Sequence, residues 1–344
     1  MKTDDYLEAS HAVYKDEVNA LQTLIRGVGR SIVGKDLVVE KLIAGALAGG
    51  HVLMEDYPGL GKTLLVKTFA RSVNADFKRV QFTPDLLPGD ILGTHVWSSK
   101  QERFEIARGP VFTNILLADE INRAPPKTQS ALLEAMEERQ VTIEGETLLL
   151  PAPFFVLATQ NPLEQEGTYP LPEAQLDRFI LRLSTGYPRD VESETEILRR
   201  RLAWKKDDPT RELKPVVDAD GFRKMQEEVE EKVYVHPALL VYISRLVRGV
   251  RDHPHVSAGP SPRGALALLR LSRAHAYLSG RNFVTPDDVK IFVEDALAHR
   301  ILLDVERALE GSEERAVVRD VLEKTEAPLR FGSAPEAQSA KRPG

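Results

Sequence analysis

One loop of the chain could hold a row of phosphates, the run Asp56–Thr63 (DYPGLGKT). Gly59 and Gly61 lack side chains, so the backbone can turn tightly and direct N–H groups at phosphate oxygens, and a following helix adds its positive end. The Lys62 ammonium can reach the β and γ phosphates, and the Thr63 hydroxyl is a ligand that suits Mg²⁺. The loop therefore predicts a site for a nucleotide and Mg²⁺.

The loop departs from the GxxxxGK[ST] pattern at one position, because Asp56 replaces the first glycine. We expect Asp56 to lie at the start of the loop, where another side chain can be accommodated. From this loop alone, a glycine-rich turn that binds nothing stays open as an alternative. The residues that we expect to contact the nucleotide are Pro58, Gly59, Leu60, Gly61, Lys62, Thr63 and Leu64.

Two more apolar runs end in polar groups. Asn114–Glu120 (NILLADE) ends in adjacent carboxylates, of which Asp119 would hold Mg²⁺ through its waters and Glu120 would act as general base on the attacking water. Phe154–Thr159 leads to Asn161, whose amide could orient that water. The plainer alternatives are a strand that meets solvent at two charges, and a turn before Pro162.

A parallel sheet would bring these groups to one edge, since ligands bind at the carboxyl ends of parallel strands. His51–Met54 reads as a buried strand before the loop and Leu64–Ala70 as the helix after it. Strand-like and helix-like segments alternate to about Tyr187, and the remainder shows helical spacing. We expect an α/β core with a parallel sheet in residues 1–187, an α-helical domain in residues 188–331 and a disordered tail in residues 332–344.

Helical spacing in the second domain is explicit. Thr285 is expected to cap a helix that begins at Pro286, and a helix could also begin at Pro262. Two stripes at steps of three and four residues predict amphipathic helices. Their members are Leu239, Tyr242, Ile243, Leu246 and Val247, and Leu266, Leu269, Arg270 and Arg273.

The core also contains two predicted β-hairpins. The first joins Gly93–Trp97 to Arg103–Ile106 and lies between a strand at Arg79–Phe82 and a helix expected after Gly109–Pro110. The second joins Gln140–Ile143 to Thr147–Leu150. Both could be structural connectors, because hairpins are ordinary ones.

The motifs together resemble the MoxR branch of the AAA+ ATPases. Five signatures recur in the family's order over about Tyr14–Leu303: GLGKT, LLADEINRAPPKTQSALLEAMEE, ATQNP, PEAQLDRF and GPSPRGALALL. The resemblance implies ATP as the nucleotide, an α/β AAA+ core with a smaller α-helical lid, and hairpins that line or approach the pore of a ring. It also implies the Walker A pair (Lys62 and Thr63), the Walker B pair (Asp119 and Glu120), the first sensor (Asn161) and an adenine pocket at Val33 and Gly34.

Two arginines gain a role from the same resemblance. Arg178, in LDRF, matches the finger that one AAA+ subunit offers to its neighbour's γ-phosphate, and Arg263 matches the second sensor on the lid. A guanidinium can stabilise charge that spreads over the transferring phosphoryl group. An ion pair of Arg178 with Asp177 or a nearby Glu is the alternative from the sequence alone. A finger in trans requires a homo-oligomer, and the family implies a hexameric ring.

Composition limits the remaining choices. The chain has 344 residues and a net charge of −6. It contains no cysteine, and this excludes disulfides and thiolate chemistry. No apolar run reaches the ~18 residues of a membrane span, and Met1–Asp5 is too acidic to open a signal peptide, so we expect a cytoplasmic protein without membrane insertion. His253 and His255 flank Pro254, where a solvated loop is favoured over a metal site.

The function expected is an ATP-hydrolysing, chaperone-like machine that acts on a protein. The family implies a partner with a von Willebrand factor A domain, and the mixed run Lys205–Asp208 could dock one, although such runs are usually just solvated. A DNA-dependent motor is the main rival, but nucleic acid is disfavoured by the net charge and by Glu144 and Glu146 at a hairpin tip. A scaffold that binds ATP with little turnover is a third possibility, favoured if Glu120, Asn161 or Arg178 were missing.

Overall fold

The computed structural model describes residues 15–162, 167–205, 210, 213–306, 313–329 and 331. The chain forms two compact units: the first comprises Asn19–Glu227, and the second comprises the described residues from Glu228 on together with those before Asn19. The first unit contains the sheet and the motifs around Lys62, Asp119 and Asn161, and the second contains Arg263. The tail at 332–344 and most of the run Lys205–Asp208 lie outside the described residues.

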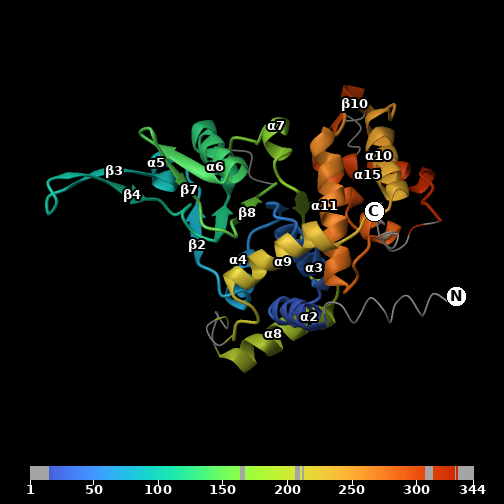
Figure 1. Cartoon of the computed structure of the whole chain (residues 1–344), viewed down its shortest axis with the longest axis horizontal. Helices are drawn as coiled ribbons and strands as arrows, with labels where there is room; N and C mark the ends of the chain where they lie inside the picture. Colours follow the sequence, from blue (N-terminus) through green and yellow to red (C-terminus); the bar gives the residue numbers. More distant parts are fainter. Residues whose placement is uncertain are drawn as a thin grey trace, which may run out of the picture. The chain divides into compact units, whose positions relative to one another are not determined.

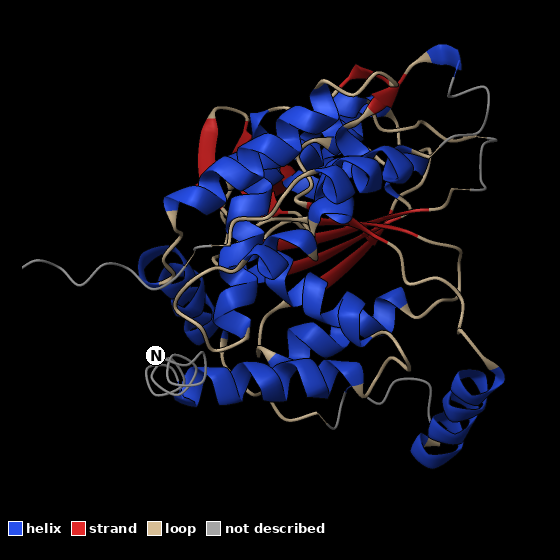
Figure 2. Ribbon diagram, turned by 90° about the vertical axis from the view of Figure 1, so that its right-hand side faces the viewer, coloured by secondary structure: helices blue, strands red, loops and turns tan. Residues whose placement is uncertain are grey.

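The first unit is built on a parallel sheet of five strands, as the alternating pattern predicted. The spatial order is β2, β5, β8, β1 and β9, and Figure 2 shows these strands lying side by side with the usual twist. Strands β1, β5 and β8 are buried along almost their whole length, as is usual for central parallel strands. The bounds are β1 Val52–Glu55, β2 Phe77–Gln81, β5 Ile115–Asp119, β8 Phe155–Gln160 and β9 Leu181–Leu183.

Helices pack around this sheet (Figure 1). Buried side chains of α6, among them Leu132 and Met136, join Leu116 and Val156 from the sheet in one apolar core. The bounds in the first unit are α2 Lys15–Gly29, α3 Asp36–Leu47, α4 Lys62–Ser72, α5 Pro88–Leu92, η1 Ile121–Arg123, α6 Pro126–Glu138, α7 Glu173–Leu176 and α8 Val191–Trp204.

Both predicted hairpins are present. Strands β3 (Gly93–Ser98) and β4 (Arg103–Arg108) pair antiparallel, and in Figure 1 they extend away from the rest of the unit. Strands β6 (Gln140–Ile143) and β7 (Glu146–Leu149) pair likewise across a turn at Glu144 and Gly145, which both have positive φ. The expected helix after Gly109–Pro110 is wrong, because only a few turn residues separate β4 from β5.

The segment that follows β9 packs with the sheet unit, although its loss of strand patterning suggested a boundary near Pro188. The Val216 N–H donates to the Ser72 carbonyl (2.8 Å), and the Phe222 ring lies edge-on to Phe69 with centroids 5.6 Å apart. The division instead falls inside α9 (Ala219–Lys232). Helical spacing marks a change of secondary structure, and it does not mark where contacts between units become sparse.

The second unit is mostly helical, as expected. The five predicted apolar positions of α10 are buried. In α11 the buried stripe runs over Ala267, Leu268 and Leu271, whereas Leu266 is exposed, so that predicted stripe was misplaced by about two residues. The bounds are α10 Pro237–Arg251, β10 Val256–Ala258, α11 Pro262–Leu278, α12 Pro286–Lys290, α13 Val293–Leu297, η3 Ala298–Arg300, β11 Leu302–Leu303 and α15 Glu314–Lys324.

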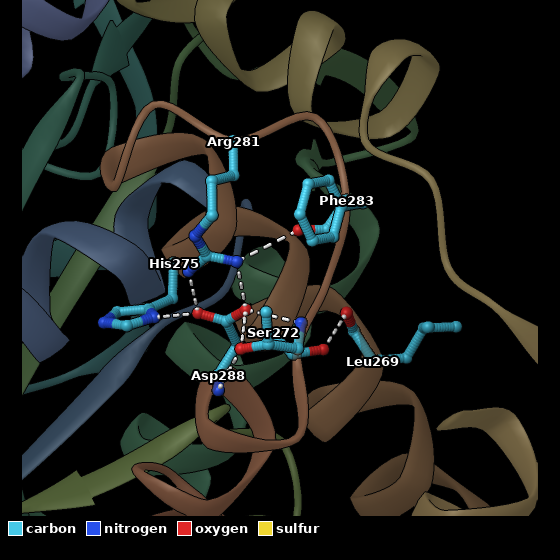
Figure 3. A network of polar contacts seen from close by, with 7 residues as sticks. Leu269, Ser272, His275, Arg281, Phe283 and Asp288 are labelled. Atoms are coloured by element: carbon cyan, nitrogen blue, oxygen red, sulfur yellow. Dashed lines mark hydrogen bonds and ion pairs between the residues drawn. The ribbon is translucent and has the colours of Figure 1, made fainter. Parts of the chain in front are cut away.

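A buried carboxylate joins α11 to α12 (Figure 3). Asp288 accepts two hydrogen bonds from the Arg281 guanidinium (2.6 and 2.7 Å), and its Oδ1 lies 2.5 Å from His275 Nδ1. It also accepts from the N–H and hydroxyl of Thr285, which caps α12 as predicted. Burial alone would raise the pKa of Asp288, but these hydrogen bonds outweigh it and lower the pKa to about 2.

Candidate nucleotide-binding site

The carboxyl ends of β1, β5 and β8 meet at one cavity of ≈ 450 Å³ in the first unit. Side chains predicted from three separate motifs line it, which is the arrangement expected at the edge of an open parallel sheet. The lining residues are Pro58, Gly59, Leu60, Gly61, Lys62, Thr63, Leu64, Lys67, Arg79, Asp119, Glu120 and Asn161.

The loop Asp56–Thr63 has the backbone that its glycines were expected to allow. Gly59 and Gly61 have φ values of +83° and +81°, a region that residues with a Cβ rarely adopt. Helix α4 begins at Lys62, directly after the left-handed Gly61, so its N–H groups face the cavity. The Lys62 ammonium donates to the carbonyl of Asp56 (2.9 Å), and burial lowers the pKa of Lys62 against the pull of Asp56, Asp119 and Glu120.

Both oxygens of Asp119 have partners. Oδ1 accepts from the Thr159 hydroxyl on β8 (2.5 Å), and Oδ2 accepts from Arg79 on β2 (2.7 Å). Because one neighbouring strand supplies each partner, the orientation of the carboxylate is set from both sides. Asp119 and the Thr63 hydroxyl are oxygen donors on the cavity wall, a chemistry that fits a hard cation such as Mg²⁺.

Glu120 adopts an uncommon backbone conformation for a non-glycine residue, with φ 56° and ψ 50°. Its N–H donates to the Thr159 hydroxyl (2.9 Å), so Thr159 holds both acids of the pair. The Glu120 Oε2 atom accepts from Gln81 on β2 (2.6 Å) and from Arg123 (3.0 Å). With this left-handed backbone at Glu120, the two adjacent carboxylates have different partners in the structure.

Sequence reasoning missed Arg79, Gln81, Arg123 and Thr159 as contacts of the acid pair. The sequence shows that Arg79 and Gln81 share one face of a strand, because they are two residues apart; that this strand lies beside β5 is known only from the structure. Gln81 and Asp119 are register partners. Without knowledge of the strand order, that pairing could not be read from the sequence.

A second cavity of ≈ 270 Å³ shares Gly59, Leu60, Gly61 and Leu64 with the first and is mostly apolar. Val33 lines it, whereas Gly34, with φ +67°, turns the backbone between Val33 and Lys35 and does not itself line the cavity. Three residues of α8, which sequence reasoning missed, complete the wall. The lining residues are Ser31, Ile32, Val33, Lys35, Gly59, Leu60, Gly61, Leu64, Gly186, Pro188, Ile197, Arg200 and Trp204.

Lys35 also lines this cavity, where its ammonium donates to the carbonyl of Tyr187 (2.9 Å). Burial lowers the pKa of Lys35, with a contribution from nearby Arg189. The size, apolar wall and position beside the loop suit a purine base.

The two arginines are placed differently. Arg178 follows α7 and does not line either cavity, and its Nη1 atom contacts the Leu133 carbonyl (2.8 Å) and Glu137 (3.1 Å) on α6. The ion pair named as an alternative is therefore present, with Glu137 as the partner. Arg263 lies in the first turn of α11, after Pro262 as predicted, and its role as a sensor stays a prediction.

None of the helices in the described part of the chain is long and apolar enough to span a membrane. Within the described ranges there is likewise no group of three or more His, Cys, Asp or Glu side chains arranged to hold a metal.

Comparison with known proteins places these features in a family. Residues 51–181 match the model of the ATPase family associated with various cellular activities (AAA), and residues 248–321 match an AAA lid domain. The chain is 45% identical to YeaC of Bacillus subtilis (strain 168), over 92% of this chain and 98% of that protein. It is 43% identical to the chaperone MoxR1 of Mycobacterium tuberculosis, over 91% of this chain and 83% of that protein.

A solved structure agrees over nearly the whole chain. A crystal structure of a provisionally assigned ATPase from Cytophaga hutchinsonii superposes with a TM-score of 0.84 at 40% identity. The match covers 94% of this chain and 98% of that one.

Proposed function

Because the chain belongs to the MoxR family of AAA+ ATPases, we propose that it hydrolyses ATP to ADP and phosphate and couples this reaction to the remodelling of protein complexes. The observation that carries the proposal is the single cavity on which Lys62, Asp119, Glu120 and Asn161 meet. A cation for the phosphates, an oxygen for the metal, a carboxylate base and an amide are the groups that phosphoryl transfer to water requires.

The phosphates would lie against the backbone N–H groups of the loop, with Lys62 at the β and γ positions. Thr63 and Asp119 would hold Mg²⁺, which neutralises phosphate charge when bound. Both oxygens of Asp119 already accept hydrogen bonds, so contact with the metal through water suits this carboxylate. The base of the nucleotide would occupy the second cavity, which Val33 lines and which lies next to Gly34 in the chain.

Glu120 would take the proton of the attacking water. Gln81 and Arg123 both contact Oε2, so Oε1 is the oxygen that would receive the proton. Asn161 lines the same cavity and would orient the water by its amide. The uncommon backbone of Glu120 supports a functional role, since such conformations cost free energy and tend to persist where function requires them.

We further propose that Arg178 completes the site of a neighbouring subunit, that Arg263 senses the nucleotide from the lid, and that the chain forms a homo-oligomer, most simply a hexameric ring. The protein would act in the cytoplasm on a client or partner with a von Willebrand factor A domain. One of its relatives carries the name chaperone, which supports an activity on proteins.

Charge argues against the DNA-dependent motor. The net charge is −6, and the tip of the second hairpin carries Glu144 and Glu146. Glu144 also contacts His95 of the first hairpin (3.1 Å), so an acidic group lies where the two hairpins meet. A surface that grips a phosphate backbone needs an excess of Lys and Arg.

The decisive experiment is Glu120→Gln. This variant should bind ATP within about threefold of the unaltered chain while turnover falls at least about 100-fold, because the amide cannot accept the proton of water. Glu138→Gln is the matched control, since Glu138 is exposed on α6 and should tolerate the change. Near-normal turnover in Glu120→Gln would remove the base assignment.

The same variant addresses the client. With ATP bound and not hydrolysed, Glu120→Gln should retain a protein partner that the unaltered enzyme releases. Recovery of a protein with a von Willebrand factor A domain in an ATP-dependent manner would support the proposed partner, and recovery of nucleic acid instead would favour the motor.

A further inference from the structure

Asp56, the residue that breaks the strict loop pattern, is buried, with 3% of its surface exposed. Its carboxylate makes five hydrogen-bond contacts, all with the three residues that follow β9. Oδ1 accepts from the Ser184 hydroxyl (2.7 Å) and from the N–H groups of Thr185 (3.0 Å) and Gly186 (3.1 Å), and Oδ2 accepts from the N–H (2.8 Å) and hydroxyl (2.9 Å) of Thr185.

These contacts fix one wall of the second cavity, which is the one proposed to hold the base of the nucleotide. Gly186 and Pro188 line that cavity, and Tyr187 lies between them. The Tyr57 ring stacks on the Tyr187 ring with centroids 5.4 Å apart, and the Tyr187 carbonyl accepts from Lys35, which also lines the cavity. Two consecutive residues, Asp56 and Tyr57, therefore hold the segment 184–187.

The backbone of Asp56 serves the other half of the site. Its carbonyl accepts from the Lys62 ammonium (2.9 Å). Asp56 therefore contacts Lys62, the residue proposed to bind the phosphates, through its backbone, and it contacts the segment 184–186 through its side chain. A glycine at this position would keep the first contact and lose the second. Asp56 in place of the pattern's first glycine therefore adds hydrogen bonds to the segment 184–186 that a glycine could not make.

We propose that Asp56 is a positioning residue that sets the base wall at 184–188 relative to the phosphate loop, and so determines affinity for the base of the nucleotide. The inference rests on the proposed binding of ATP at this site. A carboxylate that accepts from two backbone N–H groups and two hydroxyls fixes a segment more firmly than a neutral acceptor, because charge-assisted hydrogen bonds are shorter and stronger. The first glycine of the pattern cannot do this.

A merely structural anchor would behave differently from a positioning residue. Loss of an anchor would lower the stability of the protein and weaken the binding of every ligand of the site to the same extent. Loss of the positioning contacts would weaken the binding of ligands that carry a base and leave the binding of phosphate-only ligands unchanged. The comparison of two ligands on one variant separates these cases.

The experiment uses Asp56→Gly, which restores the strict GxxxxGKT pattern, in the full chain. Dissociation constants are measured calorimetrically with Mg²⁺ for ATP, GTP and inorganic tripolyphosphate. We expect ATP to bind at least about tenfold more weakly, the preference between ATP and GTP to shrink toward unity, and tripolyphosphate affinity to stay within about threefold. Asp85→Gly, at an exposed acid outside the cavities, is the control and should leave all three constants unchanged.

Equal weakening of ATP and tripolyphosphate, or unchanged ATP affinity, would overturn the inference. Failure of the unaltered chain to bind ATP would instead overturn the proposed function, so the two failures are distinguishable. Should Asp56→Gly not fold, Thr185→Val removes a single hydroxyl contact and keeps the carboxylate. Thr185→Val should weaken the binding of ATP by a smaller factor and leave the binding of tripolyphosphate unchanged. Equal effects on the two ligands would count against the inference.

Discussion

Asp288→Asn should destabilise the helical unit strongly while leaving the first unit's cavities intact. The carboxylate is almost fully buried, with its side chain 1% exposed, and it accepts from Arg281 through two nitrogens. An amide of the same shape removes the charge and places an N–H₂ group where donors already point. The guanidinium of Arg281 then lies buried beside a neutral group, which is the costly way to break such a pair.

The pKa of Asp288 gives the magnitude. A shift from 3.8 to about 2 means that the ionised carboxylate stabilises the fold relative to the neutral acid by about 2.4 kcal/mol at pH 7. Because the folded pKa is depressed, this stabilisation is complete above the unfolded pKa of 3.8 and disappears as the pH falls through about 2. At pH 3 the same relation leaves about 1.3 kcal/mol.

Hydrogen exchange of the backbone amides in α11 and α12 measures the effect where it arises. Protection in Asp288→Asn should fall about 60-fold at pH 7, the equivalent of about 2.4 kcal/mol, and the gap from the unaltered chain should narrow at pH 3. Asp287→Asn is the matched control, since its side chain is 86% exposed. Protection within about twofold of the unaltered chain would refute the reasoning, as would a gap that does not change with pH.

Three further predictions concern the proposed ATPase. Mixing Arg178→Ala with Lys62→Ala subunits should restore up to about a quarter of turnover, because random assembly pairs an intact loop with an intact finger at that frequency, and no recovery at any ratio would count against a finger in trans. Added DNA should change the ATPase rate by less than about twofold, since the chain carries a net charge of −6, and strong stimulation would revive the motor. Gly61→Ala should weaken ATP binding at least about tenfold, because φ is +81° there and a Cβ strains that conformation; unaltered affinity would show that the loop tolerates it.

The elements that depend on local sequence were the most predictable. Apolar runs such as Ile115–Leu117 are buried on both faces, so their composition marks strands without further context. Thr285 and Pro286 mark a helix start by local hydrogen bonding and by the fixed φ of proline, and the structure has that start. These signals depend on neighbours in the sequence, which is why they can be read from it.

Contacts between distant segments could not be read in the same way. Asp56 lies more than 100 residues from the segment that its carboxylate holds, and no local pattern links the two. The walls supplied by α8 and the partners of Glu120 on β2 depend on strand order and on helix packing. The motifs therefore predicted side chains that line one cavity, whereas the side chains that orient them depend on the tertiary fold.

Arg178 shows how magnitudes decide between two readings that the sequence left even. Its ion pair with Glu137 joins side chains that are 31% and 34% exposed, and pairs of that kind contribute about 0 to 1 kcal/mol. An arginine finger is worth about 10³ to 10⁵ in rate, or roughly 4 to 7 kcal/mol in the transition state. The contact with Glu137 therefore costs little to exchange for a phosphate, and its presence does not argue against a role in trans. The Nε atom of Arg178 is buried without a hydrogen-bond partner among the described residues, so the guanidinium still has donor capacity that its present contacts leave unused.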